Sequence, residues 1–394
     1  MSTENKTGMG VLALLPILFG FFVMGFVDII GTATEYVKND FNLSDKVASF
    51  LPSMIFLWFF VVSVPASILT SRIGRKNTVL VSLFITISAL LIAYFAYAHL
   101  YAIYVAFALL GIGNTIIQAA LPALMSNVTS AGQLTSRLSL GQFVKALCAA
   151  LSPIIAGLAA QQLGNWKLIF PIYAGITLIA AVWLLMTPVK REVSTAQTTT
   201  FGGCLALLGN PFILAMFSGI FFVVGVDVGL NYAIPPYLKE VCQLDKDKAA
   251  MGPTVYFVAK TIGSFLGAII LAKYSPAKCF PISALLAFAG TMAMLFVKDA
   301  TLVLSCVFIA SLGIANIFGM VFGQAMNRVP EKANEAAGLM VMAIAGGAVV
   351  PPLMGALKAA VGPSGLVYVL MGCLVYLIGL GVFVAKQATS VQSK

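Results

Sequence analysis

Two stretches of the sequence, about half the chain apart, decide the fold. Residues 21–45 read FFVMGFVDIIGTATEYVKNDFNLSD, and residues 221–245 read FFVVGVDVGLNYAIPPYLKEVCQLD. Both begin with Phe-Phe-Val, place a glycine two residues later, and follow that glycine with an aspartate. A nearly equal offset relates GIGN at 111–114 to GIAN at 313–316. Several matches at one offset predict a chain built from two related halves.

The composition shows that the solvent of this chain is lipid. Of its 394 residues, 60% are hydrophobic and 9% are charged, and the mean hydropathy is +1.02. A soluble chain carries roughly 25% charged residues, so these charges are too few to cover a water-facing surface. The net charge of +10 does not indicate nucleic acid, because the basic residues stand singly or in pairs between apolar runs. We therefore expect a lipid bilayer as partner and no nucleic acid.

Twelve apolar runs are each long enough to cross a bilayer, which requires about 20 residues. The longest connection is the polar segment 188–204, which we interpret as a cytoplasmic linker between two six-helix bundles at 1–187 and 205–394. The predicted spans are 10–36, 47–70, 77–97, 101–127, 136–162, 167–187, 205–236, 249–272, 279–297, 301–326, 335–360 and 364–385. The predicted fold is an all-α membrane protein whose two bundles are related by a pseudo-two-fold axis.

The placement of lysine and arginine predicts the orientation. With a cytoplasmic N-terminus, thirteen of these residues fall in cytoplasmic segments and seven on the other side, and every arginine is cytoplasmic. Cytoplasmic loops of membrane proteins are enriched in lysine and arginine. The opening MSTENKTG has no basic leader followed by a cleavage site, so we expect the first apolar run to be retained. The prediction is a multi-pass protein of the bacterial inner membrane with both termini cytoplasmic.

Ionisable residues inside the spans are candidates for function, because a charge at the bilayer centre costs roughly 2.5–3.5 kcal/mol. They are Asp28, Lys145, Asp227 and Lys260, with Glu35 and Lys358 nearer the span ends. A carboxyl group in a poorly solvated cavity takes up a proton more readily. Asp28, Asp227 and Glu35 are therefore predicted to couple transport to protons, with an Asp–Lys contact holding one access state. A static ion pair between helices is the alternative.

Polar side chains in the spans suggest where a solute binds. The predicted substrate-binding residues are Asn114, Gln118, Gln142, Lys145, Asn231, Tyr232, Lys260, Asn316 and Gln324. Amides both donate and accept hydrogen bonds, which suits a polyhydroxylated solute. Interhelical hydrogen bonds, worth about 0.6 kcal/mol on average in a membrane, are the alternative for each amide.

The sequence lacks the patterns that carry catalysis or bind cofactors. It has no nucleophile–His–acid set, no metal-ligand cluster and no phosphate-binding loop, and its six cysteines are scattered without CxxC spacing. We therefore expect no enzyme activity, no metal and no cofactor, with a proton as the coupling ion. The expected partners are a small-molecule substrate and the bilayer, and the protein is expected to be a monomer.

The segment SRIGRKNTVL at 71–80 resembles the G-x-x-x-D-R-x-G-R-K signature of the major facilitator superfamily. Arg72, Gly74, Arg75 and Lys76 match it. A basic cluster at helix ends can bind the last carbonyls of a neighbouring helix, so these residues are predicted to form a conformational latch.

Within that superfamily, most of the chain resembles the fucose–proton symporter group of sugar permeases. The similar stretches are GIGNTIIQAALP (111–122), SRLSLGQ (136–142), IGSFLGAIILAKYSPAK (262–278) and MAIAGGAVVPPLMG (342–355). The resemblance implies the major facilitator fold, sugar transport, and a sugar contact for Gln142. It also shows Lys145 where the group usually has asparagine.

The predicted function is secondary active transport of a small hydrophilic solute, a sugar or sugar derivative, by proton-coupled symport with alternating access. Two alternatives stay open. Lys145 and Lys260 could pair with an anionic solute such as a sugar acid. The second alternative is a proton-coupled exporter of drugs or metabolites, although the amide-rich spans favour a hydrophilic solute.

Overall fold

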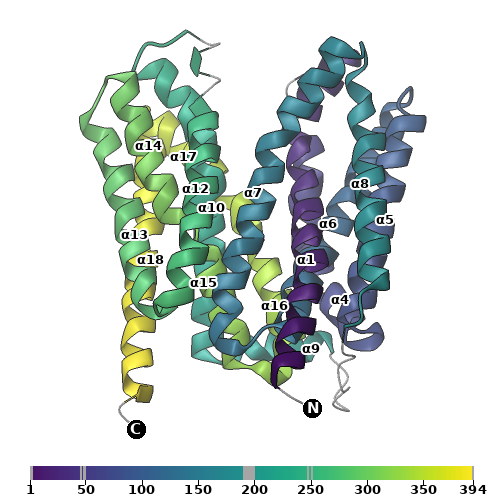
Figure 1. The fold of residues 1–394 in the computed structure, drawn as a ribbon. Coiled ribbons are helices and arrows are strands. Elements are labelled where there is room, and N and C mark those ends of the chain that lie inside the picture. The colour runs from purple at the N-terminus through teal and green to yellow at the C-terminus, as the bar shows by residue number, and fades with distance from the viewer. Residues whose placement is uncertain are drawn as a thin grey trace. The chain divides into compact units, whose positions relative to one another are not determined.

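The structure is all-helical in the part of the chain that it describes. The computed structural model describes residues 3–44, 47, 50–189, 200–245, 248–249 and 252–392. Long helices follow one another along the chain from α1 to α18 (Figure 1), and no strand occurs within these ranges.

The first half of the chain supplies six long helical segments. They are α1 (Thr3–Met24) with η1 (Gly25–Ile29) and α2 (Ile30–Asp40), α4 (Phe50–Ile73), α5 (Arg75–Phe95), α6 (Leu100–Val128), α7 (Ala131–Gln162), and η2 (Trp166–Leu168) with α8 (Ile169–Met186). A short helix, α9 (Phe201–Ala206), and η3 (Leu207–Gly209) come before the second half.

The second half repeats the pattern. Its elements are α10 (Pro211–Glu240), α12 (Gly252–Lys273), α13 (Pro276–Ala293) with η4 (Met294–Phe296), α14 (Ala300–Ile314), α15 (Ile317–Arg328), η5 (Pro330–Lys332), α16 (Ala333–Met342), η6 (Ala343–Ala345), α17 (Gly346–Val361) and α18 (Ser364–Gln392). Ten helices of the described chain are long and apolar enough to cross a membrane. Shorter apolar helices at Ala13–Val27 and Leu57–Ile73 fall on the first two predicted spans. The predicted fold class is confirmed.

The helix of the seventh span begins later than predicted. The seventh span was predicted to begin at 205, but α10 begins at Pro211. The side chain of Asn210 caps it by accepting hydrogen bonds from the backbone N–H of Phe212 at 2.9 Å and of Ile213 at 3.4 Å. An asparagine cap followed by proline is a strong helix start, and the apolar residues before it belong to α9 and η3.

The repeat of the sequence is visible in how glycines pack. A Cβ atom on Gly25 of η1 would lie 2.7 Å from the carbonyl oxygen of Lys145 on α7. A Cβ on Gly225, the counterpart on α10, would overlap Val350 on α17. The first and fifth spans thus approach closely in one half, and the seventh and eleventh do so in the other.

A second pair of contacts repeats the same relationship between neighbouring spans. A Cβ atom on Gly113 of α6 would lie 3.3 Å from the carbonyl oxygen of Ser82 on α5. A Cβ on Gly313 of α14 would lie 2.7 Å from the carbonyl oxygen of Ser283 on α13. Small residues allow such close approach of helix backbones. The halves therefore share one packing scheme as well as a sequence pattern.

The contacts within the chain divide it into two compact units. Unit 1 contains residues 1–134, 144–209 and 326–342, and unit 2 contains 135–143, 210–325 and 343–394. Each unit takes a segment from the other half of the sequence. In unit 1, α16 lies beside α4, where a Cβ on Gly338 would touch Ser67.

In unit 2, the first turns of α7 lie against α12 and α15. Ser136 donates a hydrogen bond to the carbonyl of Ala268 at 2.7 Å, and Thr135 packs on Gly323. Residues 190–199 of the predicted linker lie outside the described residues. The two-bundle division at 188–204 stays a prediction.

Three of the long spans are interrupted. The first is broken by η1, the tenth by a turn at Ala315 and Asn316, and the eleventh by η6. Broken helices in membrane proteins free backbone groups and occur where a protein lines a cavity or binds a solute.

Candidate functional site

A cluster of charged and polar groups lies near the middle of α10. Asp227 accepts a hydrogen bond from the ammonium of Lys260 at 2.6 Å on one oxygen, and from the hydroxyl of Tyr256 on the other. The exposed fractions of the Lys260 and Asp227 side chains are 26% and 24%. The pair is therefore partly desolvated but still open to a small solute or to water.

The geometry of the cluster follows from helix periodicity. Tyr256 and Lys260 stand four residues apart on α12, so they lie on one face of the helix and both reach Asp227. The Lys260 ammonium also lies 3.4 Å from the Tyr256 hydroxyl and 5.6 Å from the centre of its ring. Both carboxylate oxygens are held, and protonation of Asp227 would remove the charge that holds Lys260. The structure thus brings together two of the predicted residues, and their roles stay predictions.

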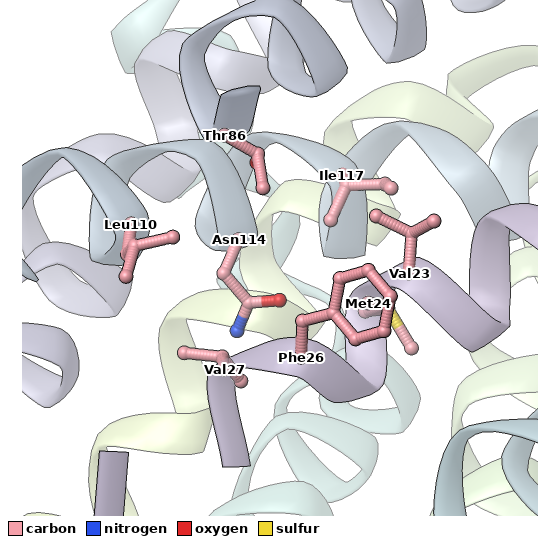
Figure 2. Close-up of a pocket in the computed structure, with 8 residues that line it drawn as sticks. All are labelled: Val23, Met24, Phe26, Val27, Thr86, Leu110, Asn114 and Ile117. Carbon is pink, nitrogen blue, oxygen red and sulfur yellow. The ribbon is translucent and has the colours of Figure 1, made fainter. Parts of the chain in front are cut away.

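A second polar feature lies in unit 1, where a small cavity is enclosed by α1, η1, α5 and α6. Figure 2 shows Asn114 of α6 with its amide directed toward Phe26 and Val27 of η1. The side chain of Asn114 is 4% exposed, and neither its nitrogen nor its oxygen has a hydrogen-bond partner among the described residues. Thr86 of α5 is the other polar residue of the lining.

The corresponding asparagine of the second half is packed differently. Asn316 donates a hydrogen bond from its amide nitrogen to the carbonyl of Gly263 at 2.7 Å. Its amide also fills the space that a Cβ on Gly267 would occupy. Asn316 therefore joins the broken tenth span to α12, and its role in substrate binding stays a prediction.

The other predicted substrate residues are distributed along the spans. Gln118 is buried on α6, and the exposed fraction of Tyr232 on α10 is 49%. Gln142 and Asn231 are half-buried, and the buried side-chain nitrogen of Gln324 has no hydrogen-bond partner in the described chain. The structure does not join these residues by any hydrogen bond that would define one site.

Lys145 differs from Lys260 in its surroundings. It is half-buried on α7, and no carboxylate pairs with it among the residues described. The side chains of Asp28 and Glu35, two predicted proton-coupling residues, lie outside the described part, and only their backbones in η1 and α2 are described.

Comparison with known proteins assigns the family. Residues 17–352 match the profile of the Major Facilitator Superfamily. The chain belongs to the major facilitator superfamily. It is therefore a multi-pass membrane protein of this type, and the recognition made from the signature at 71–80 is confirmed.

Proteins similar to this chain over most of its length include a sugar transporter and two symporters of known structure. The chain is 24% identical over 371 residues to a glucose/galactose transporter of Brucella abortus, which covers 89% of this chain and 88% of the relative. The structure of FucP, the fucose:proton symporter of E. coli, in the outward conformation has a TM-score of 0.84 at 18% identity, covering 95% of this chain and 99% of that one. The proton:xylose symporter XylE has a TM-score of 0.74 at 15% identity, covering 96% and 95%.

The superfamily signature forms a hydrogen-bonded cluster at the junction of α4 and α5. Gly74 has φ +86, a conformation that glycine adopts without strain, and it separates the two helices. Lys76 donates hydrogen bonds to the carbonyls of Leu185 at 2.9 Å and Thr187 at 2.8 Å, at the end of α8. A lysine at a helix C-terminus satisfies carbonyls that have no partner within the helix.

Arg75 joins three helices in unit 1. It donates to Asn334 of α16 at 2.8 Å, and to the carbonyl of Ala123 and the hydroxyl of Ser126 of α6, both at 3.0 Å. Arg72 is exposed. Lys76 therefore contacts the end of α8, and Arg75 contacts α6 and α16. The role of the four predicted latch residues in conformational change stays a prediction.

Sequence reasoning missed a cluster around Asp40. One oxygen of Asp40 accepts hydrogen bonds from the Tyr97 hydroxyl at 2.8 Å and the Trp166 indole at 3.1 Å. Tyr36 stacks on Trp166 at 4.6 Å, and the Lys167 ammonium lies 4.2 Å from the centre of the Tyr97 ring. Burial, together with the hydrogen bond to Asp40 and its negative charge, raises the pKa of Tyr97 above its usual 10.0. These contacts fix the end of α2 against the turn after α5 and against η2.

The described residues offer no metal centre. No group of three or more His, Cys, Asp or Glu side chains in the described chain could hold a metal ion.

Proposed function

We propose that this chain is a secondary active transporter that carries a sugar across the membrane together with a proton. The half-buried cluster of Asp227, Tyr256 and Lys260 carries the proposal. An ion pair inside a membrane is costly and is generally retained for function. The names of a glucose/galactose transporter, a fucose:proton symporter and a proton:xylose symporter support a sugar as substrate and a proton as coupling ion.

The cluster suggests how proton binding changes the site. In the unprotonated state, the Asp227 carboxylate holds the Lys260 ammonium and the Tyr256 hydroxyl. A proton on Asp227 weakens its attraction for Lys260, which then becomes available to donate hydrogen bonds to the hydroxyls of a sugar. Substrate binding and proton binding would thus favour each other, because the coupling between two binding sites is reciprocal.

Each unit contains a segment from the other half of the sequence. We propose that the contacts with these segments break and re-form during alternating access. The hydrogen bond between Arg75 and Asn334 links a residue of the first sequence half to one of the second. Ser136 and Ala268 do the same within unit 2. We propose that these contacts break when the bundles 1–187 and 205–394 move, with Arg72, Gly74, Arg75 and Lys76 as the latch.

The remaining expectations belong to the same proposal. The distribution of lysine and arginine supports a location in the bacterial inner membrane with both termini in the cytoplasm. The transporter is proposed to act as a monomer, with a proton as coupling ion and without a bound cofactor.

One observation favours a second candidate substrate class. Lys145 is half-buried and has no carboxylate partner among the described residues, whereas the charge of Lys260 is neutralised by Asp227. An unpaired cation inside a membrane is stabilised by an anion. An anionic solute such as a sugar acid would supply one.

Uptake by the purified protein in liposomes tests both candidates. Radiolabelled glucose, galactose, fucose and xylose are compared with glucuronate and galacturonate. Saturable uptake of a neutral sugar supports the proposal. Uptake of a sugar acid that is lost in a Lys145→Gln variant supports the second candidate instead. Absence of saturable uptake for all six solutes would refute sugar transport.

A further inference from the structure

The Asn114 cavity has the features of a binding site for one oxygen atom. Its volume is about 10 Å³, close to the minimum that one water molecule requires. Asn114 is 4% exposed, and its donor and its acceptor both lack partners in the described chain. Buried amides without partners destabilise a protein, so they are generally satisfied by an ordered water or a ligand.

The opposite half of the molecule shows that this arrangement is not required by the fold. Asn316 occupies the corresponding position in the repeat and is 8% exposed. Its amide nitrogen bonds to Gly263, and Gly267 leaves room for the side chain. Asn114 instead projects toward Phe26 and Val27 of the irregular turn η1 (Figure 2). Asn316 thus makes one amide hydrogen bond, with its oxygen lacking a partner in the described chain, whereas neither amide atom of Asn114 has a partner there.

We propose that the cavity between α1, η1, α5 and α6 binds a single hydroxyl-type oxygen, supplied by a water molecule or by a sugar hydroxyl. Asn114 both donates to and accepts from this oxygen. Thr86 takes part as an acceptor, because its own hydroxyl proton is already donated to the carbonyl of Ser82 at 2.9 Å. The apolar neighbours Phe26 and Val27 exclude further solvent, so one oxygen fills the site. The sugar as source rests on the proposed function, whereas the water does not.

A structure of the sugar-free protein, at a resolution that shows buried waters, tests the water directly. Density within about 3.2 Å of the Asn114 amide is expected. Thermal unfolding without sugar gives an independent reading with Asn114→Leu, a substitution of similar size. If an oxygen satisfies the amide, Asn114→Leu leaves the midpoint unchanged or lowers it. If the amide is unsatisfied in a dry cavity, the variant is more stable than the wild type.

Transport of deoxy sugars distinguishes the two sources. If a sugar hydroxyl binds Asn114, one deoxy sugar shows about a tenfold higher KM than its parent in the wild type. That ratio falls to about one in Asn114→Leu. It is kept in Thr291→Val, a control that removes a buried hydroxyl without a partner in the described chain, from the other half. An unchanged ratio in Asn114→Leu, with density at the site, assigns the oxygen to water.

Three results together would overturn the proposal: no density beside the Asn114 amide, a higher unfolding midpoint in Asn114→Leu, and the same KM ratio of deoxy to parent sugar in Asn114→Leu as in the wild type. If the wild type transported no sugar, the proposed function would fail, and the density and the unfolding midpoint would still decide the site.

Discussion

Replacing Lys260 with methionine tests how much the ion pair between Lys260 and Asp227 contributes to stability and to proton coupling. The change removes the ammonium and keeps a side chain of similar length. A hydrogen bond to a charged group contributes about 1.5–3 kcal/mol. Because 26% of Lys260 and 24% of Asp227 remain exposed, water offsets part of this loss, so we expect the lower end, about 1.5 kcal/mol.

A double-mutant cycle isolates the interaction from the effects of each substitution alone. The variants are Lys260→Met, Asp227→Asn and the double change, and the measurement is the free energy of unfolding in mixed micelles. The neutral pair in the double variant has no charge left without a partner, so its destabilisation should be smaller than the sum of the single effects. The expected coupling energy is about 1–2 kcal/mol.

The ion pair of Lys358 and Glu240, at the ends of α17 and α10, supplies a matched control. Its side chains are 27% and 39% exposed, so Lys358→Met should cost less and leave sugar uptake unchanged. Lys260→Met should abolish the proton movement that accompanies uptake. Additive effects of Lys260→Met and Asp227→Asn, with proton movement intact in both, would refute the reasoning.

Three further predictions concern packing and the ends of the spans. Gly346→Ala should destabilise the protein by about 1–3 kcal/mol in the same unfolding assay, because its Cβ would overlap the carbonyl of Phe221. Gly372→Ala, whose Cβ meets nothing within 4 Å, should not destabilise it, because alanine is the better helix former. Gly74→Ala should cost about 1–3 kcal/mol from backbone strain at φ +86, and an unchanged unfolding curve would contradict that assignment. Because the pKa of Tyr97 is raised, the folded protein retains a proton that the unfolded chain loses above about pH 10, so stability should fall as the pH rises beyond that value. The decline of stability with pH should be shallower in Tyr97→Phe and unchanged in Tyr101→Phe, which replaces an exposed tyrosine. Equal slopes of stability against pH in the wild type and both variants would exclude the effect.

The sequence predicted those features that depend on local chemistry. Apolar length located the spans, because a segment that crosses lipid must be apolar throughout. The scarcity of charge singled out Asp227 and Lys260, because a charge within a span requires a partner. The spacing of Tyr256 and Lys260 could also have indicated that both reach one acidic residue.

Features that depend on the opposing helix could not be predicted. Asn114 and Asn316 occupy nearly identical motifs, yet one faces a cavity and the other fills the space above Gly267. The difference lies in the packed neighbour, which neither motif contains. Asp40 was missed for a similar reason, since its partners Tyr97 and Trp166 are far away in the sequence and a single acid after a span gives no signal.

Sugar-driven proton movement tests the central claim most directly. The purified protein is placed in liposomes that contain a pH-sensitive dye, and a neutral hexose is added outside without an ion gradient. Acidification of the interior is expected in the wild type and should be lost in Asp227→Asn. Hexose uptake without any change in internal pH would contradict proton symport, and acidification that persists in Asp227→Asn would contradict the role of the cluster.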